Sequence, residues 1–308
     1  MGRCDLADLI ANGIAPHRLY RLSAQPFFLT VFTSLAYGFC EQALWSQRCQ
    51  LNGTNTPGMT TRGKQMVEST EDLRENIALS CRILAMEGCA DGVLGHVSAR
   101  IAGQNEMWVR CRSQEEQGVR YTTADAIRRV DFDGKGPFLG VGYQVPNELP
   151  IHGEIYKKRR EVGCVIHAHP SEALICGIAD LELRPIFGAF NIPAMRMALE
   201  GIPRFPRSYL VTRPELAAPM IEIMGEKNIC LMKGHGVTVT GKTVEEATVR
   251  TLNFHALAKI TLKVAQTGRT APDIPPEDVA QLPDLGSTFN DLWAWRYYVK
   301  KLAEEDRR

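Results

Sequence analysis

The sequence predicts a mixed α/β fold, with one domain over residues 66–268 and an extension at each end. Segments whose apolar residues recur at helical spacing alternate with short runs rich in Val, Ile and Met, a pattern typical of helices packed on a sheet. Glycine and proline separate these segments at the expected boundaries. The hydrophobic fraction of 44% and the charged fraction of 23% are ordinary for a globular protein, which excludes a wholly disordered chain.

The first elements of this domain follow from a capping pattern and a helical repeat. Ser69 and Asp72 resemble a capping box, and Gly88 supplies a stop, so residues 70–87 are predicted to form an amphipathic helix. The next elements are shorter. In chain order they are predicted strands over residues 97–101 and 107–111, a capped helical turn over 122–127, and a strand with a turn over 130–134.

The second half contains longer elements. Residues 147–160 are predicted to be helical, with Pro150 tolerated in the first turn, and residues 244–265 form a long helix ended by Gly268. Predicted strands cover residues 162–169, 229–232 and 237–240. Residues 269–308 are predicted to form a proline-rich connector and a C-terminal aromatic helix. That helix either packs its apolar face on the core or covers an aromatic pocket.

Residues 1–65 differ from the rest because they lack helical or strand periodicity. We interpret them as a poorly ordered extension, or as the product of an upstream start codon with Met59 or Met66 as the true beginning. A secretory signal fits poorly, because the charged region is long and no clear cleavage site follows. The longest apolar run, residues 27–40, is shorter than the roughly 18 residues that a spanning helix needs. No membrane association is expected.

Charge and cysteine content indicate which partners are excluded and which cellular compartment is favoured. The 36 Lys and Arg against 35 Asp and Glu leave a net charge of +1, which argues against a nucleic-acid partner. The nine cysteines are odd in number and contain no CxxC pair. This favours reduced thiols in a cytoplasmic protein over a disulfide framework.

Three histidines suggest a metal site. His167 and His169 lie two residues apart in a predicted strand, so alternation sends both side chains to the same face. His235, between two glycines after the strand over 229–232, brings a third imidazole to the same edge. Three imidazoles with an open fourth position are typical of a catalytic divalent metal. The alternatives are a chance HxH pair in a buried strand and a simple glycine turn.

Glu148 and His152 lie four residues apart near the start of a predicted helix, so they share a face. Beside such a metal, Glu148 is a candidate general acid or base. Alternatively, it only stabilises the helix N-terminus through the macrodipole. His152 is either a residue that supports the ligands or a helix surface residue.

These residues resemble a known family. Residues 148–156 read ELPIHGEIY, residues 159–169 read RREVGCVIHAH, and residues 231–236 read LMKGHG. Over about residues 70–265 the chain resembles the class II aldolase/adducin family. The resemblance implies a three-layer αβα sandwich around a largely antiparallel sheet, and a homotetramer with its site at a subunit interface. It also implies that His167, His169 and His235 bind a divalent metal, with zinc as the first choice and manganese, cobalt or Fe(II) as alternatives. Glu148 is then an acid/base or a further ligand.

Departures from the sugar-phosphate members of that family indicate a substrate without phosphate. Pro146 and Asn147 precede the glutamate where those members carry two serines, and His96 replaces the asparagine of their phosphate loop. His96, within GHVSAR, resembles members that decarboxylate hydroxylated aromatic acids, and is a candidate catalytic residue. The alternative is a turn residue bonded to backbone. Arg110 and Arg112 are candidate clamps for a substrate carboxylate, or simply solvated arginines.

The leading hypothesis is a metal-dependent carbon–carbon lyase that decarboxylates a small hydroxylated aromatic or β-keto acid. One alternative is a retro-aldolase acting on a non-phosphorylated hydroxy-keto substrate. A second alternative is a non-catalytic, adducin-like interaction module, and a third is oxygen-dependent cleavage supported by Fe(II).

Overall fold

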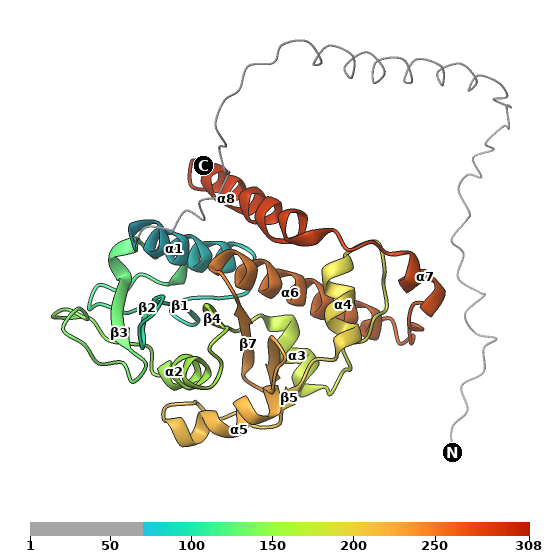
Figure 1. The fold of residues 1–308 in the computed structure, drawn as a ribbon. Helices are drawn as coiled ribbons and strands as arrows, with labels where there is room; N and C mark the ends of the chain where they lie inside the picture. The colour runs from blue at the N-terminus through green and yellow to red at the C-terminus, as the bar shows by residue number, and fades with distance from the viewer. Residues whose placement is uncertain (1–69) are drawn as a thin grey trace, which may run out of the picture. The chain divides into compact units, whose positions relative to one another are not determined.

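The computed structural model describes residues 70–308, so the prediction for residues 1–65 lies outside the described part. A seven-stranded sheet with the order β3-β2-β1-β4-β7-β6-β5 forms the centre (Figure 1). The strands are β1 (His96–Arg100), β2 (Glu106–Arg110), β3 (Ile127–Asp131), β4 (Cys164–Ala168), β5 (Arg204–Phe205), β6 (Ile229–Met232) and β7 (Gly236–Gly241). All neighbours are antiparallel except β5 and β6. The expectation of a largely antiparallel sheet is therefore confirmed.

Helices cover both faces of this sheet (Figure 1). The longer helices are α1 (Thr70–Met86), α2 (Leu149–Lys158), α3 (Ser171–Ile178), α4 (Ile192–Glu200), α5 (Pro214–Met224), α6 (Val244–Gln266) and α8 (Ala294–Glu305). The short ones are α7 (Pro276–Gln281), a π-helical segment (Thr288–Trp293) and two 3-10 turns (Val119–Tyr121 and Ala124–Ala126). The result is the three-layer αβα sandwich that the resemblance implies.

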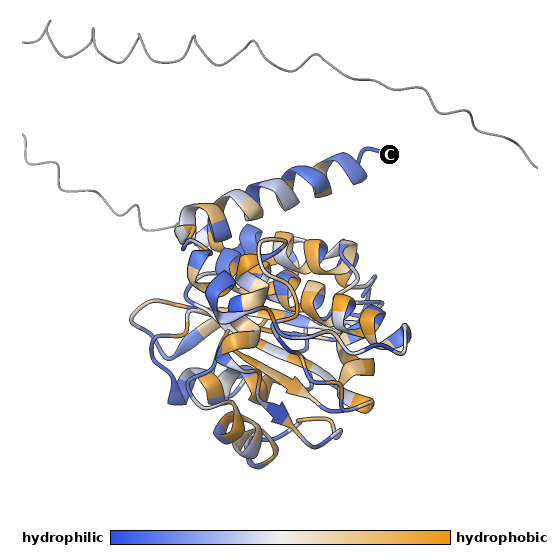
Figure 2. Cartoon of the chain, turned by 90° about the vertical axis from the view of Figure 1, so that its right-hand side faces the viewer, coloured by the Kyte–Doolittle hydropathy of each residue, from blue (hydrophilic) through white to orange (hydrophobic). Residues whose placement is uncertain are grey.

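Two separate apolar cores explain why the strands are buried on both faces. The first, here called the α6 face, packs α1, α3, α4, α6 and α8 against one side of the sheet. The second, the α2 face, packs α2 and α5 against the other. Along β4, Cys164 and Ile166 point to the α6 face and Val165 to the α2 face, as strand alternation requires. Figure 2 shows the apolar residues concentrated in the strands and in the helix sides that face them.

The segment between β4 and β6 contains α3, α4, α5 and β5, which the sequence analysis left unassigned. Helices of this length are marginal on local propensity and owe their stability to packing. Pro219 lies within α5 and weakens its helical pattern further. β3 begins at Ile127, ahead of the predicted strand at residue 130, directly after the short 3-10 turn at Ala124–Ala126.

The C-terminal helix α8 and the residue before it divide their aromatic side chains between core and surface. Trp295 and Leu302 are buried in the α6-face core, which confirms the expected packing face at these positions. Trp293 and Tyr297 are instead 55% and 59% exposed.

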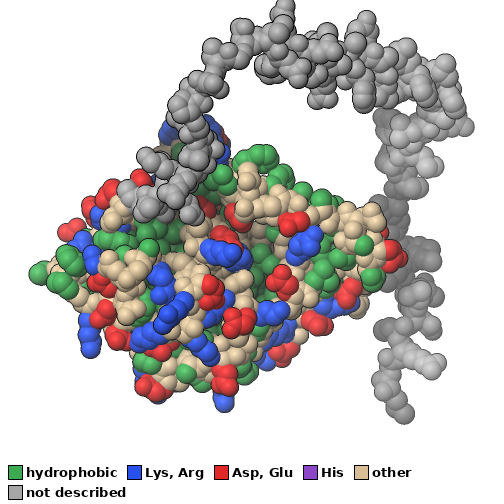
Figure 3. Space-filling model, in the orientation of Figure 1, with side chains coloured by type: hydrophobic (Ala, Val, Ile, Leu, Met, Phe, Trp, Pro, Cys, Tyr) green, Lys and Arg blue, Asp and Glu red, His purple; other side chains and the backbone are tan. Residues whose placement is uncertain are grey.

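On the face drawn in Figure 3, basic and acidic side chains are interspersed. Among the described residues, no helix has both the length and the hydropathy needed to cross a bilayer.

Candidate metal centre

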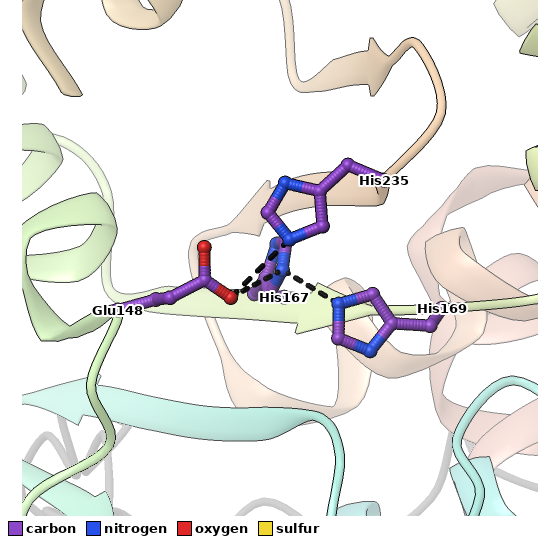
Figure 4. Close-up of side chains that lie close together, drawn as sticks. All are labelled: Glu148, His167, His169 and His235. Atoms are coloured by element: carbon purple, nitrogen blue, oxygen red, sulfur yellow. Dashed lines mark hydrogen bonds and ion pairs between the residues drawn. The ribbon is translucent and has the colours of Figure 1, made fainter. Parts of the chain in front are cut away.

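Four side chains from three parts of the chain converge at one end of the central strands β4 and β7 (Figure 4). His167 lies near the end of β4, His169 just beyond it, His235 in the turn between β6 and β7, and Glu148 at the N-cap of α2. Their candidate ligand atoms all lie within 4.8 Å of one another. Because β7 pairs with β4, the turn that precedes β7 meets the residues that follow β4.

The glycines on either side of His235 are required by this close approach. Gly234 has a φ of +66°, a conformation that side chains with a Cβ rarely adopt. A Cβ at Gly236 would lie 2.4 Å from the carbonyl oxygen of Ala168 and 2.5 Å from Cδ2 of His169. The Gly-His-Gly sequence is therefore what allows His235 to lie against the end of β4.

The spacing of the donor atoms fits a single divalent ion. His167 Nε2 and His169 Nε2 are 3.0 Å apart, and Oε2 of Glu148 lies 3.3 Å from Nε2 of both His167 and His235. Tetrahedral ligands at about 2.0–2.1 Å from zinc are separated by roughly 3.3–3.4 Å. Three of the distances between the four atoms are close to this value and all lie within 4.8 Å, so the four atoms can surround one ion after the cluster contracts.

The other ring nitrogens of the three histidines differ in their partners. His167 Nδ1 lies 3.3 Å from Oγ1 of Thr238, a contact of the kind that orients metal-binding histidines. Nδ1 of His169 and of His235 are buried without a hydrogen-bond partner among the described residues. Burial, with the nearby His167, lowers the pKa of His169 to about 3. His169 is therefore neutral at physiological pH and offers a lone pair.

Glu148 is buried and held in place by a backbone group. Its side chain is 4% exposed, and its Oε1 accepts a hydrogen bond of 2.8 Å from the amide of Val211. Burial raises the pKa of this carboxyl, but hydrogen bonds from His167 and His235 outweigh burial and hold it below its usual range. The carboxylate thus stays ionised, with Oε2 directed at the histidines. Val211 lies in the segment that the sequence analysis left unassigned.

His96 lies beside the cluster, and its interpretation as a turn residue bonded to backbone is wrong. It is the first residue of β1, 4% exposed and paired in register with His167. The two ring centroids are 5.2 Å apart. Its Nδ1 lies 2.6 Å from Nε2 of His152, which is fully buried, so His152 is not a surface residue.

Two further residues of this network were missed by the sequence analysis. Ser98 Oγ lies 2.6 Å from His152 Nδ1 and 2.8 Å from the hydroxyl of Tyr156. Spacing offered a clue, since Ser98 follows His96 by two residues on a strand and Tyr156 follows His152 by four on a helix.

The structure places the side chain of Arg110 on the face of the sheet away from the histidines. Arg110 follows Val109, which points to the α2 face, so its own side chain points to the α6 face, away from the histidines. There it is 2% exposed and donates to Oγ1 of Thr122 at 2.9 Å and to Glu116 at 2.5 Å. The expectation that Arg110 clamps the substrate is therefore corrected. Its donors are occupied by the fold.

Arg112 forms hydrogen bonds with the segments that precede the two candidate catalytic residues, Glu148 and His96. Its backbone exchanges hydrogen bonds of 2.9 and 2.8 Å with Gln144, four residues before Glu148. One guanidinium nitrogen reaches the carbonyl oxygen of Val93, three residues before His96, at the long distance of 3.4 Å. Its Nε is buried without a hydrogen-bond partner among the described residues.

Comparison with known proteins identifies the family. The sequence matches the Class II Aldolase and Adducin N-terminal domain over residues 75–262. The chain belongs to this family. It is 44% identical to a 3,4-dihydroxyphthalate decarboxylase of Arthrobacter keyseri over 75% of this chain and 94% of that protein. It is 40% identical to an enzyme of the same name from a Terrabacter species, over 75% and 97% of the two chains.

Solved structures of the class II aldolase family share the fold. An aldolase II superfamily protein from Pseudomonas syringae superimposes with a TM-score of 0.64 at 18% identity, over 76% of this chain and 93% of that chain. The predictions of an α/β sandwich and of an enzyme of the lyase type are therefore confirmed. A divalent metal fits both the family and the donor set.

Proposed function

We propose that this protein decarboxylates a hydroxylated aromatic acid of the 3,4-dihydroxyphthalate type. The observation that carries the proposal is the 44% identity to a 3,4-dihydroxyphthalate decarboxylase over 94% of that enzyme. The lack of the phosphate-binding residues of sugar-phosphate aldolases supports the same substrate class. Vicinal hydroxyls beside a carboxylate are also the oxygen ligands that a divalent ion binds readily.

In this proposal, His167, His169 and His235 hold the ion, with Glu148 as a further ligand or as an acid/base. A bound divalent ion supplies Lewis-acid polarisation of the substrate oxygens. Zinc is our first choice from the three nitrogen ligands, with manganese, cobalt and Fe(II) as alternatives. The hydrogen bond from the Val211 amide orients Glu148, so that one carboxylate oxygen is fixed and the other faces the reacting groups.

The remaining roles belong to groups that hold the substrate and move its protons. Loss of carbon dioxide leaves an electron pair on the ring carbon, which must take up a proton. His96, which lies beside the cluster, or Glu148, which belongs to it, delivers that proton. Arg112, with an unpartnered donor, binds a substrate carboxylate.

We further propose a cytoplasmic homotetramer. The family resemblance supports the assembly. All six cysteines in the described residues are buried and free, as a reducing compartment would leave them.

The decisive experiment measures the products of the metal-loaded enzyme. With 3,4-dihydroxyphthalate we expect one equivalent of carbon dioxide per substrate consumed, no aldehyde and no oxygen uptake. Metal analysis should find one divalent ion per chain, and a chelator should abolish activity that zinc or manganese then restores. Release of an aldehyde from a hydroxy-keto acid, with no carbon dioxide from any hydroxyaromatic acid, would instead establish the aldolase alternative.

A further inference from the structure

Four buried side chains on the α2 face form one continuous line of hydrogen bonds that ends at the candidate metal centre. The line runs from Tyr156 through Ser98 and His152 to His96, with contacts of 2.8, 2.6 and 2.6 Å. The Tyr156 hydroxyl also lies 3.0 Å from the carbonyl oxygen of Ser98. All four residues are at most 4% exposed, so no solvent is needed to complete the line.

The carbonyl at one end sets the direction of donation. A carbonyl oxygen only accepts, so the single Tyr156 proton goes to Ser98 O. The phenol oxygen then accepts from the Ser98 hydroxyl, and Oγ in turn accepts from Nδ1–H of His152. Nε2 of His152 is left without a proton and accepts from Nδ1–H of His96. In this direction each of the four contacts is a hydrogen bond with one donated proton.

The opposite direction leaves one contact without a proton. If Ser98 donates to His152 Nδ1, then His152 donates from Nε2 to His96, and Tyr156 can serve only one of its two oxygen neighbours. One of the two oxygen–oxygen contacts of 2.8 and 3.0 Å would then lack a hydrogen bond, so the opposite direction makes one hydrogen bond fewer. Burial also lowers the pKa of His152 to about 3, so this ring carries a single proton at neutral pH.

We propose that Tyr156, Ser98 and His152 are positioning residues that fix His96 as the Nδ1–H tautomer, with the lone pair of its Nε2 available to the substrate. Nε2 of His96 forms no hydrogen bond to any described residue. His96 therefore begins the reaction as a proton acceptor and not as a proton donor. This proposal rests on the proposed function for its chemistry, but the tautomer itself is a property of the free enzyme.

The tautomer assigns the order of the proton steps. His96 Nε2 first takes the proton of a substrate hydroxyl, and the ring becomes an imidazolium. The bond between the ring carbon and the carboxylate carbon then breaks. Its electron pair stays on the ring carbon as carbon dioxide leaves, and that carbon forms a C–H bond with the proton from Nε2. His96 returns to its starting state, and the product oxygen regains a proton from solvent.

The test is the tautomer of His96 in the zinc-loaded enzyme, read by long-range proton–nitrogen correlation NMR on protein labelled with ¹⁵N-histidine. The His96→Gln variant identifies the His96 resonances by their absence. We expect a protonated Nδ1 and an unprotonated Nε2 in the wild type. A protonated Nε2 with a bare Nδ1 would overturn the proposal. Because no substrate is present, this result is independent of whether the protein decarboxylates anything.

Tyr156→Phe removes one oxygen atom and tests the direction in which the line of hydrogen bonds donates. Without the phenol oxygen, the Ser98 hydroxyl has only His152 Nδ1 to donate to. The direction of donation along the line then reverses, and His96 becomes the Nε2–H tautomer. We expect kcat to fall about 10–100-fold, with metal content and KM unchanged. An unchanged tautomer in this variant would overturn the proposal.

Tyr209→Phe is the matched control. It removes a phenol hydroxyl that donates to Leu216 O at 3.3 Å beside the same apolar core, with no connection to His96. Both the His96 tautomer and kcat should match the wild type.

Discussion

Two buried polar clusters lie on opposite faces of the same sheet and differ in how their hydrogen bonds are completed. On the α6 face, Arg110 is 2% exposed and donates to both Glu116 and Thr122. On the α2 face, His167 and Glu148 are buried and His169 and His235 are partly buried, and Nδ1 of His169 and of His235 have no hydrogen-bond partner among the described residues. The ligand atoms of this second cluster converge within 4.8 Å.

The difference shows that burial of charged or polar groups does not by itself mark a functional site. The Arg110 cluster pairs donors with acceptors, as the fold requires of a buried charge. The histidine cluster instead brings several lone pairs to one point, which is unfavourable until a cation or a proton is supplied. The first cluster is therefore structural, and the second is built for a ligand.

Removing a ligand from the second cluster should have the largest effect. His167→Ala should abolish both metal binding and activity, because the remaining donors no longer surround the ion. Metal analysis and carbon dioxide release measure the two losses together, and circular dichroism checks the fold. His235→Ala, in a turn outside the strands, should behave alike. Full activity in either variant would contradict the assignment of the metal centre.

Glu148→Gln should separate metal binding from turnover. The amide keeps the shape of the side chain but loses the negative charge and the ability to take up a proton. We expect kcat to fall by about 10²–10⁴-fold with the metal retained. Loss of the metal in this variant would show that Glu148 acts mainly as a ligand.

Breaking the Arg110 cluster should cost stability and leave the chemistry intact. Arg110→Met leaves Glu116 without its buried partner, so the free energy of unfolding should fall by about 3 kcal/mol. The kcat and KM of the folded enzyme should not change. Arg213→Met, at an exposed pair of 3.7 Å with Glu215, should change stability by less than about 0.5 kcal/mol. A raised KM for Arg110→Met would restore its role as a substrate clamp.

Arg112→Gln should have the opposite effect to Arg110→Met, with KM changed and stability retained. Loss of a charged hydrogen bond to the substrate carboxylate, worth about 1.5–3 kcal/mol, should raise KM about 10–100-fold. The free energy of unfolding should change little, because among the described residues the guanidinium forms a single hydrogen bond, the long one to Val93. Urea denaturation and steady-state kinetics measure both effects, and an unchanged KM would remove Arg112 from the site.

The smallest effect concerns pH. The pKa of His152 is about 3 in the folded protein against 6.5 for an unperturbed histidine, because burial and the nearby His167 disfavour its charged form. Between these values the unfolded chain binds the extra proton, so stability falls as the pH falls from about 6.5 toward 3. This group contributes up to about 1.4 kcal/mol per pH unit. The slope from denaturation between pH 5 and 6.5 should flatten in His152→Gln, whereas Arg110→Met should keep it.

Much of the site follows from spacing along the chain. His167 and His169 share a face because strands alternate, and Gly234 and Gly236 mark the turn that presents His235. The residues that escaped prediction act through distant partners. The Val211 amide reaches Glu148 from a segment whose helices depend on packing, and Ser98 meets Tyr156 only because β1 lies beneath α2.

By itself, the sequence determined the family, the principal helices and strands, and the set of residues that could bind a metal. These depend on local periodicity and on motifs read within a few residues. Only the tertiary structure decided which buried groups are paired and which are free. It turned Arg110 toward the α6 face, and it brought His96 into register with His167. Burial on both faces of a sheet makes such positions look alike in the sequence, and hydrogen-bond partners distant along the chain tell them apart.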